Sequence, residues 1–260
     1  MGVTSPTIPE GYIEYAPPPS LREYVECFWT RGAAPPNAPA EHIIPDGCID
    51  LVLGYGATWG APRPNATLAV GTMTRPLVLA ADEGQSRAFA GVRFWPGRAL
   101  PFLGVPAAEL TDLRVDIADL WSDRRLIESL DGHEPSSVRH AFEELLNARL
   151  DRARPLDKTV DAAVRAILRA GGNLSIAALA PALGVTRQHL ARAFALHVGV
   201  PPKMFARVAR VRGALARARV SATVDWVTLA LDAGYYDQSH LAGEVKAITG
   251  RTPSDWLASA

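Results

Sequence analysis

A motif that occurs twice near the C-terminus constrains this chain more than any other feature of its sequence. The first copy, at 179–202, is LAPALGVTRQHLARAFALHVGVPP, and the second, at 229–253, is LALDAGYYDQSHLAGEVKAITGRTP. The offset between matching residues is 50 up to the glycine of each turn (Gly184 and Gly234) and 51 from there to the final proline, because the second turn is one residue longer. Each copy has the order helix, glycine turn, helix, glycine-proline exit, which is typical of a helix-turn-helix. Two copies predict a protein that binds double-stranded DNA with two recognition helices.

The charge distribution supports this prediction. The formal net charge is zero, yet residues 151–260 carry 15 Lys or Arg against 8 Asp or Glu, and residues 1–150 carry 12 against 19. Between Asp161 and Asp225 there is no acidic residue and there are ten basic ones. Such asymmetry indicates that the C-terminal half meets a polyanion.

The first unit is expected to hold two short helices on either side of Gly184. Ser175 and Thr186 are the expected N-caps of these helices, which cover 176–183 and about 187–197. The N-terminal half of a recognition helix enters the major groove. The expected DNA-binding residues there are Thr186, Arg187, Gln188, Ala191 and Arg192. Arginine suits guanine and glutamine suits adenine, so Arg192 and Gln188 are the expected base-reading residues.

In the second unit, Thr223 or Ser221 is the expected cap of a helix over 224–232, and Asp237 the expected cap of a recognition helix over 238–249. The expected DNA-binding residues of this helix are Asp237, Gln238, Ser239, Ala242 and Gly243. Gly243 stands where the first unit has Arg192, and glycine reads no base. This unit is therefore expected to contribute positioning more than specificity.

Residues 203–219 are expected to form one continuous helix that links the two units, with an apolar stripe and basic residues elsewhere. This helix would place the recognition helices roughly one turn of DNA apart, about 34 Å, in successive major grooves. Phosphate contacts are expected from Lys203, Arg207 and Arg210, and DNA affinity would then fall steeply with salt.

The C-terminal part of the sequence resembles a known family. The stretch GYYDQSHLAGEVKAITGRTPSDW, 234–256, is similar to the signature of the AraC/XylS-type transcription regulators, and the resemblance extends over about 155–258. It implies a bacterial transcription regulator, with activation favoured over repression and RNA polymerase as a protein partner. Two residues depart from the family's pattern: Val245, where phenylalanine is usual, and Gly243, where a polar or basic residue is common.

The N-terminal half has a different pattern. The segments 11–15, 42–56, 67–73, 76–81 and 88–95 are short, rich in β-branched and aliphatic residues, and separated by Gly and Pro. They predict an antiparallel sheet folded into a small barrel or sandwich. Residues 21–31 are consistent with a helix or a strand. The expected fold class is therefore α+β, with a β-rich N-terminal domain, following helices, and an all-α double helix-turn-helix domain.

The boundaries follow from where the pattern changes. The β-rich domain is expected over 1–105, a helical extension and linker over 106–154, and the DNA-binding domain over 155–260, with helix-turn-helix units at about 175–197 and 223–249. Within the extension, 105–121, 123–130 and 136–153 show apolar residues at helical spacing. These helices would either cap the sheet or pair two chains as a homodimer. Asp157 is the expected cap of a helix over 158–170.

The segments HIIPDGCIDLVL, 42–53, and GVRFWPGRA, 91–99, resemble a β-rich, sensor-like domain found fused to such regulators. This resemblance implies a sensory or interaction role and names no ligand. The candidate residues for binding a small-molecule effector are His42, Asp46, Trp59 and Trp95, although the aromatic ones among Trp29, Trp59, Phe94 and Trp95 fit a hydrophobic core equally well.

An alternative is a bifunctional protein in which Cys48 acts as a nucleophile and the DNA-binding domain targets the reaction. Its distinguishing feature would be an environment that favours the Cys48 thiolate. The main interpretation remains a protein that is not an enzyme. Neither a cofactor nor a metal site is expected, because the two cysteines, Cys27 and Cys48, form no CxxC or Cys/His cluster. No secretory signal or membrane span is visible, so a cytoplasmic protein without membrane contact is expected.

Overall fold

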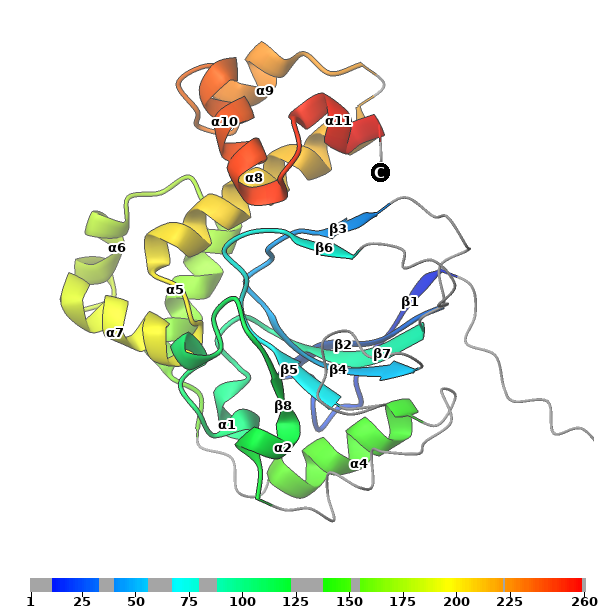
Figure 1. Ribbon diagram of the computed structural model, residues 1–260. Coiled ribbons are helices and arrows are strands. Elements are labelled where there is room, and N and C mark those ends of the chain that lie inside the picture. The colour runs from blue at the N-terminus through cyan, green and yellow to red at the C-terminus, as the bar shows by residue number, and fades with distance from the viewer. Residues whose placement is uncertain are drawn as a thin grey trace, which may run out of the picture.

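The computed structural model describes residues 11–32, 40–55, 67–79, 88–122, 138–150, 155–221 and 223–258. Strands gather in the N-terminal part and helices in the C-terminal part, with α8 running from one group of helices to the other (Figure 1). The expected α+β class is confirmed. The expected helix at 123–130 lies outside the described residues.

The N-terminal part is built on a six-stranded antiparallel sheet with strand order β1-β2-β7-β4-β5-β8. Its strands are β1 (Tyr12–Tyr15), β2 (Val25–Arg31), β4 (Ile49–Tyr55), β5 (Thr67–Val70), β7 (Ala88–Phe94) and β8 (Arg114–Asp116). A separate two-stranded ribbon pairs β3 (Glu41–Ile43) with β6 (Leu77–Leu79). In Figure 1 this ribbon lies on the side of the sheet that faces α8.

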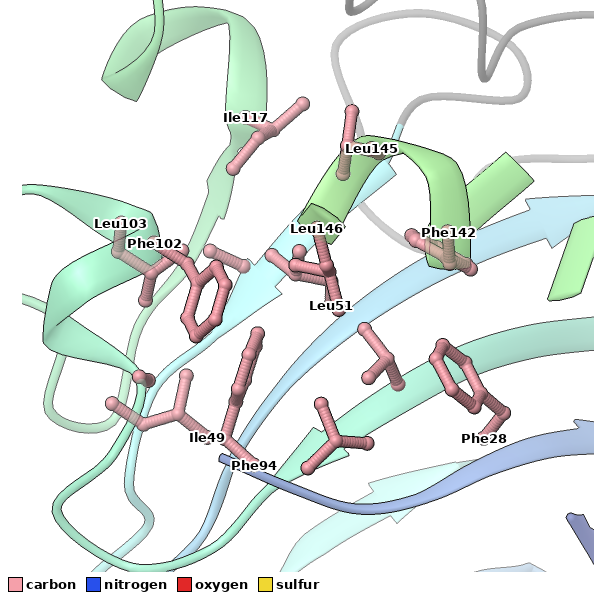
Figure 2. Packing of buried hydrophobic residues seen from close by; sticks show 14 of the residues in the cluster. Phe28, Ile49, Leu51, Phe94, Phe102, Leu103, Ile117, Phe142, Leu145 and Leu146 are labelled. Carbon is pink, nitrogen blue, oxygen red and sulfur yellow. The ribbon is translucent and has the colours of Figure 1, made fainter. Parts of the chain in front are cut away.

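The opposite face of the sheet carries the main hydrophobic core. Helix α4 (Val138–Leu150) covers this face and buries Val138, Phe142, Leu145 and Leu146 against it. Phe94 of β7 stacks on Phe102, which belongs to α1 (Leu100–Leu103), with ring centroids 5.2 Å apart (Figure 2). Of the two expectations for these helices, α4 therefore follows the first and caps the sheet.

The expectation of one helix over 105–121 is wrong. The segment forms a 3₁₀ turn η1 (Ala107–Glu109), then strand β8, then the short helix α2 (Ile117–Leu120). Asp112, with φ of 58°, cannot continue a helix, and its carboxylate is bonded to the backbone N–H and hydroxyl of Thr74. Strand β8 then pairs with β5, so the sheet extends past position 105.

The C-terminal part consists of helices in the expected order. They are α5 (Lys158–Arg169), α6 (Ile176–Ala182), α7 (Arg187–His197), α8 (Pro202–Val220), α9 (Trp226–Asp232), α10 (Gln238–Thr249) and α11 (Pro253–Ala258). Two hydrophobic clusters flank α8. Phe194 and Phe205 are fully buried in the first, and Leu241 and Val245 are buried in the second. Helix α8 contributes to both clusters, as its predicted apolar stripe requires.

Most of the predicted N-caps are confirmed. Asp157, Ser175, Thr186 and Asp237 each accept a hydrogen bond from a backbone N–H in the first turn of their helix. The prediction of Thr223 or Ser221 as the cap of α9 is wrong. Asp225 takes this role, because its carboxylate accepts from the N–H of Val227 and of Thr228 and from the Thr228 hydroxyl. Among the described residues, no helix is both long enough and apolar enough to cross a membrane.

Candidate nucleic-acid interface and N-terminal cavity

The first recognition helix, α7, presents a polar face that its own fold leaves open. The Thr186 hydroxyl accepts from the N–H of His189 at 3.1 Å and starts the helix. Leu190 and Phe194 are fully buried beneath it. The predicted DNA-binding residues are exposed on the outer side: Thr186, Arg187, Gln188, Ala191 and Arg192. Within the described part of the chain, no hydrogen bond or ion pair occupies the side chains of Arg187, Gln188 or Arg192.

The second recognition helix, α10, is capped and buried in the same way as α7, but it carries fewer large polar side chains on its outer face. The Asp237 carboxylate accepts from the N–H of His240 at 2.7 Å, and Leu241 is buried below. Gln238, Ser239 and Gly243 are exposed, and Ala242 is half-buried. The outer face of α10 is therefore open but narrow.

The three expected phosphate contacts differ in how free they are. Lys203 is exposed at the start of α8. Arg207, in contrast, makes a bidentate pair with Glu244 of α10, with Nη2 donating to Oε1 at 2.8 Å and Nε donating to Oε2 at 3.0 Å. These hydrogen bonds raise the pKa of Arg207. Arg210 donates to the carbonyl oxygen of Gly172 at 3.0 Å.

Arg207 and Arg210 thus hold the two units together, a role that the sequence analysis did not assign to them. A signal was present: Glu244 is the first glutamate after a long basic stretch. Their phosphate contacts stay a prediction.

A cavity of about 250 Å³ lies between the six-stranded sheet and the β3–β6 ribbon. Its apolar surface comes from both sides, with Tyr12, Trp29, Val52 and Phe89 on the sheet and Ile43, Leu77 and Leu79 on the ribbon. Cavities of this kind, mostly apolar with a few polar groups, are the usual form of small-molecule sites.

Three polar residues of the cavity lining, Asp46, Asp50 and Arg93, form one half-buried cluster. Asp50 accepts from the indole N–H of Trp29 at 2.9 Å and from Nε of Arg93 at 3.2 Å, and Asp46 lies 3.5 Å from the same Nε. Burial raises the pKa of Asp50 to about 6, although the nearby Arg93 opposes this shift. Burial likewise raises the pKa of Glu26 nearby. One guanidinium thus faces more than one carboxylate in a setting with little water.

Comparison with known families agrees with the geometry of the C-terminal helices. Residues 179–259 match the model of a helix-turn-helix domain family. This region is an AraC/XylS-type helix-turn-helix domain. A chain with an AraC/XylS-type domain is a DNA-binding transcription regulator.

Outside the AraC/XylS-type domain, the comparisons say less. Residues 13–116 match a family described only as a domain of unknown function, DUF6597. No curated protein matches the chain. The solved structures most similar to it include ToxT from Vibrio cholerae O395 (11% identity, TM-score 0.43, 89% of this chain and 97% of that one). A second crystal form of ToxT gives 12% identity, a TM-score of 0.46, and 89% and 98% coverage. The structure of the xylose-binding transcription activator xylR gives 16% identity and a TM-score of 0.36, and the match covers 48% of this chain and 39% of that one.

The structure separates the four candidate effector residues. Asp46 lines the cavity, together with Trp29. His42 does not line it, because alternation along β3 turns its side chain toward the AraC/XylS-type domain, where Nδ1 lies 3.3 Å from the carbonyl oxygen of Thr249. Trp95 does not line it either, and its indole N–H donates to the carbonyl of Arg22 at 3.3 Å. Trp59 lies outside the described residues.

The surroundings of Cys48 do not favour a thiolate. Its side chain is buried, its Sγ lies 3.6 Å from a carboxylate oxygen of Glu26, and burial together with Asp46 raises its pKa well above the usual value. A nucleophilic cysteine needs the opposite shift. The Cys48-dependent enzyme alternative therefore lacks the feature that would distinguish it.

Proposed function

We propose that this protein binds a specific DNA site by placing α7 and α10 in successive major grooves. The observation that carries the proposal is the shared construction of the two helices: each is capped at its N-terminus, buried on its inner face and open on its outer face. Helix α8 contributes side chains to both hydrophobic clusters and joins the units. Lys203 and the exposed first turns of the recognition helices would contact phosphates.

The experiment that tests this proposal is a selection of bound fragments from genomic DNA with the purified full chain, at two salt concentrations. We expect one enriched asymmetric motif with two short boxes about one helical turn apart. The affinity of the protein for this motif should fall steeply as the salt concentration rises, because phosphate contacts release counterions. Salt-sensitive binding without any enriched motif would contradict sequence-specific recognition.

Arg192 is the sharpest test of base reading. Its side chain is exposed and unoccupied within the described part of the chain, so Arg192→Ala should leave the fold unchanged. The variant should bind the selected site about 1–3 kcal/mol more weakly and random DNA with nearly wild-type affinity. Lys203→Ala is the matched control: it should weaken both by a similar factor and lower the salt slope by about 1. If Arg192→Ala behaves like Lys203→Ala, Arg192 contacts phosphate and not a base.

We further propose that the cavity of the N-terminal domain binds the effector. Its lining favours a small, mostly apolar molecule with one polar group able to meet Arg93, Asp46 or Asp50. A library of small molecules can be screened by thermal unfolding of the full chain. A true cavity ligand raises the unfolding temperature of the wild type and not that of Val52→Trp, which fills the space. Hits that stabilise both proteins equally would place the site elsewhere.

The remaining parts of the proposal follow from the AraC/XylS-type domain. We expect the protein to activate transcription in contact with RNA polymerase, and the N-terminal domain either to sense the effector or to mediate dimerisation. Reconstituted transcription from the selected site, with and without the protein, distinguishes activation from repression. The divisions near residues 105 and 154 remain predictions in the same sense.

A further inference from the structure

Two segments of the N-terminal domain, 41–48 and 70–77, form a wall that has the cavity on one side and the AraC/XylS-type domain on the other. The residues of this wall that line the cavity are Glu41, Ile43, Asp46, Cys48, Val70, Gly71, Met73 and Leu77. The residues that contact the other domain are interspersed among them: His42, Gly47, Thr72 and Pro76. Alternation of this kind is what extended backbone produces. The wall is therefore one chain thick.

The wall holds the first helix-turn-helix unit at the end of its recognition helix. The Thr72 hydroxyl donates to the carbonyl oxygen of Val198 at 2.6 Å, and this bond is buried. Next to it, the Thr111 hydroxyl donates to the carbonyl oxygen of Gly199 at 2.8 Å. Val198 is the C-cap of α7 and follows its last residue, His197.

The wall holds the second unit at the corresponding place. Nδ1 of His42 lies 3.3 Å from the carbonyl oxygen of Thr249, to which it can only donate. Pro76 packs against Gly250, where an added Cβ would lie 3.2 Å from the proline ring. The 51-residue offset of the duplicated motif matches Val198 with Thr249 and Gly199 with Gly250. The same backbone carbonyl is thus bonded in both units.

Between these two points the wall also contacts α8. The Asp46 carboxylate lies 3.8 Å from Nη1 of Arg212, and it also lies 3.5 Å from Nε of Arg93 inside the cavity and accepts from the backbone N–H of Cys48 at 2.9 Å. Gly47 comes so close to the Phe205 ring that a Cβ there would lie 2.3 Å from it. The N-terminal domain therefore meets both recognition helices and the helix that joins them.

These contacts leave the outer faces of α7 and α10 open. They therefore affect the positions of the two helices and not which bases their side chains can contact. We propose that Thr72 and His42 are positioning residues that set the distance between the two DNA boxes the protein accepts, through a wall whose other side responds to the content of the cavity. This rests on the two-groove DNA binding proposed above. The competing explanation is that α8 and the Arg207–Glu244 pair alone fix the two units.

The test is a spacing scan. Full-length protein is titrated with duplexes that contain the two selected boxes at separations from about 8 to about 14 base pairs, around the helical turn of about 10.5. Wild type should lose on the order of tenfold in affinity away from its best spacing. Thr72→Val and His42→Phe should each lower that discrimination by about fivefold, the factor that one net hydrogen bond represents.

Two controls keep the readout specific. Thr72→Ser retains the hydroxyl and should restore the wild-type spacing profile. Thr67→Val removes a buried hydroxyl for which the structure shows no hydrogen-bond partner within the described residues, and it should leave the profile unchanged. A variant that merely folds less well loses active protein equally at every spacing, so its profile keeps its shape.

The outcomes separate the two proposals. If wild type shows no preferred box or spacing, the proposed DNA-binding mode fails. If wild type is selective and Thr72→Val and His42→Phe keep the same profile, the two-groove mode stands and the positioning role is overturned. Broader profiles in both variants, with rescue by Thr72→Ser, support it.

Discussion

Gly243 offers a prediction in which stability and DNA binding can be separated. It lies inside α10, on the outer face, and an added Cβ would meet no atom within 4 Å. An exposed glycine in a helix interior destabilises by about 0.5–1 kcal/mol relative to alanine. Gly243→Ala should therefore raise the free energy of unfolding by that amount. Gly213→Ala in α8, where a Cβ is equally unobstructed, is the matched control and should gain about the same.

The two positions differ in what they face, and Gly243 is exposed whereas Gly213 is half-buried. Gly243 corresponds to Arg192 in the duplicated motif, so Gly243→Arg would place a guanidinium on the face of α10 that is proposed to enter the groove. We expect tighter binding to the selected site and a salt slope steeper by about 1 for one added phosphate contact.

Chemical denaturation and fluorescence anisotropy with labelled duplexes measure the two effects on the same samples. Gly243→Ala and Gly213→Ala should change stability and leave the salt slope at the wild-type value. If Gly243→Arg folds normally and neither affinity nor salt slope changes, α10 does not approach DNA in the proposed way. If Gly213→Ala gains stability and Gly243→Ala does not, the account of Gly243 as a purely entropic cost is refuted.

Two further predictions concern the turn of each unit and the buried carboxylate of the cavity. Gly234→Ala should destabilise more than Gly184→Ala in denaturant titrations: both have positive φ (77° and 72°), a strain of about 1–2 kcal/mol, but only at Gly234 would the Cβ lie 2.4 Å from the side chain of Asn173. Equal losses would mean that this side chain moves aside freely. For Asp50, whose pKa is raised from 3.8 to about 6, the folded state binds the proton more tightly than the unfolded state. Its contribution to stability is thus present below pH about 4 and is lost as pH rises through about 6. Wild type should lose stability relative to Asp50→Asn over this range, and parallel pH profiles would contradict the shift.

Local signals in the sequence predicted the C-terminal helices well. Caps such as Thr186 and Asp237 work within one helical turn, so residue type and spacing suffice to place them. The failure at α9 has the same cause. The prediction named Ser221 or Thr223, and the structure shows that the carboxylate of Asp225, a capping residue type a few positions further on, reaches the first-turn N–H groups instead.

Expectations that depended on distant contacts did less well. The apolar spacing over 105–121 fits a helix, but pairing of β8 with β5 and the bonds between Asp112 and Thr74 decide otherwise. A count of basic residues could not separate Lys203, which is exposed, from Arg207, whose charge is already met by Glu244. Net charge describes the field around a domain and not the partner of each side chain.

The wall has one property that its sequence predicts, the alternation of its side chains, and one that it does not, which of them face the cavity. Its period-two pattern requires that His42 and Ile43 point in opposite directions, which can be known from any extended segment. Which of the two faces the cavity depends on what packs on either side, and both sides are supplied by residues far away in the chain, the sheet on one and the AraC/XylS-type domain on the other. His42 was for this reason a fair candidate for binding an effector, and its observed partner is the carbonyl of Thr249. A residue that faces away from the cavity can still respond to its content, because a strand cannot move one face without moving the other. On this reasoning a ligand that fills the cavity and the substitution His42→Phe should change the same observable, the spacing preference, although they act on opposite sides of β3.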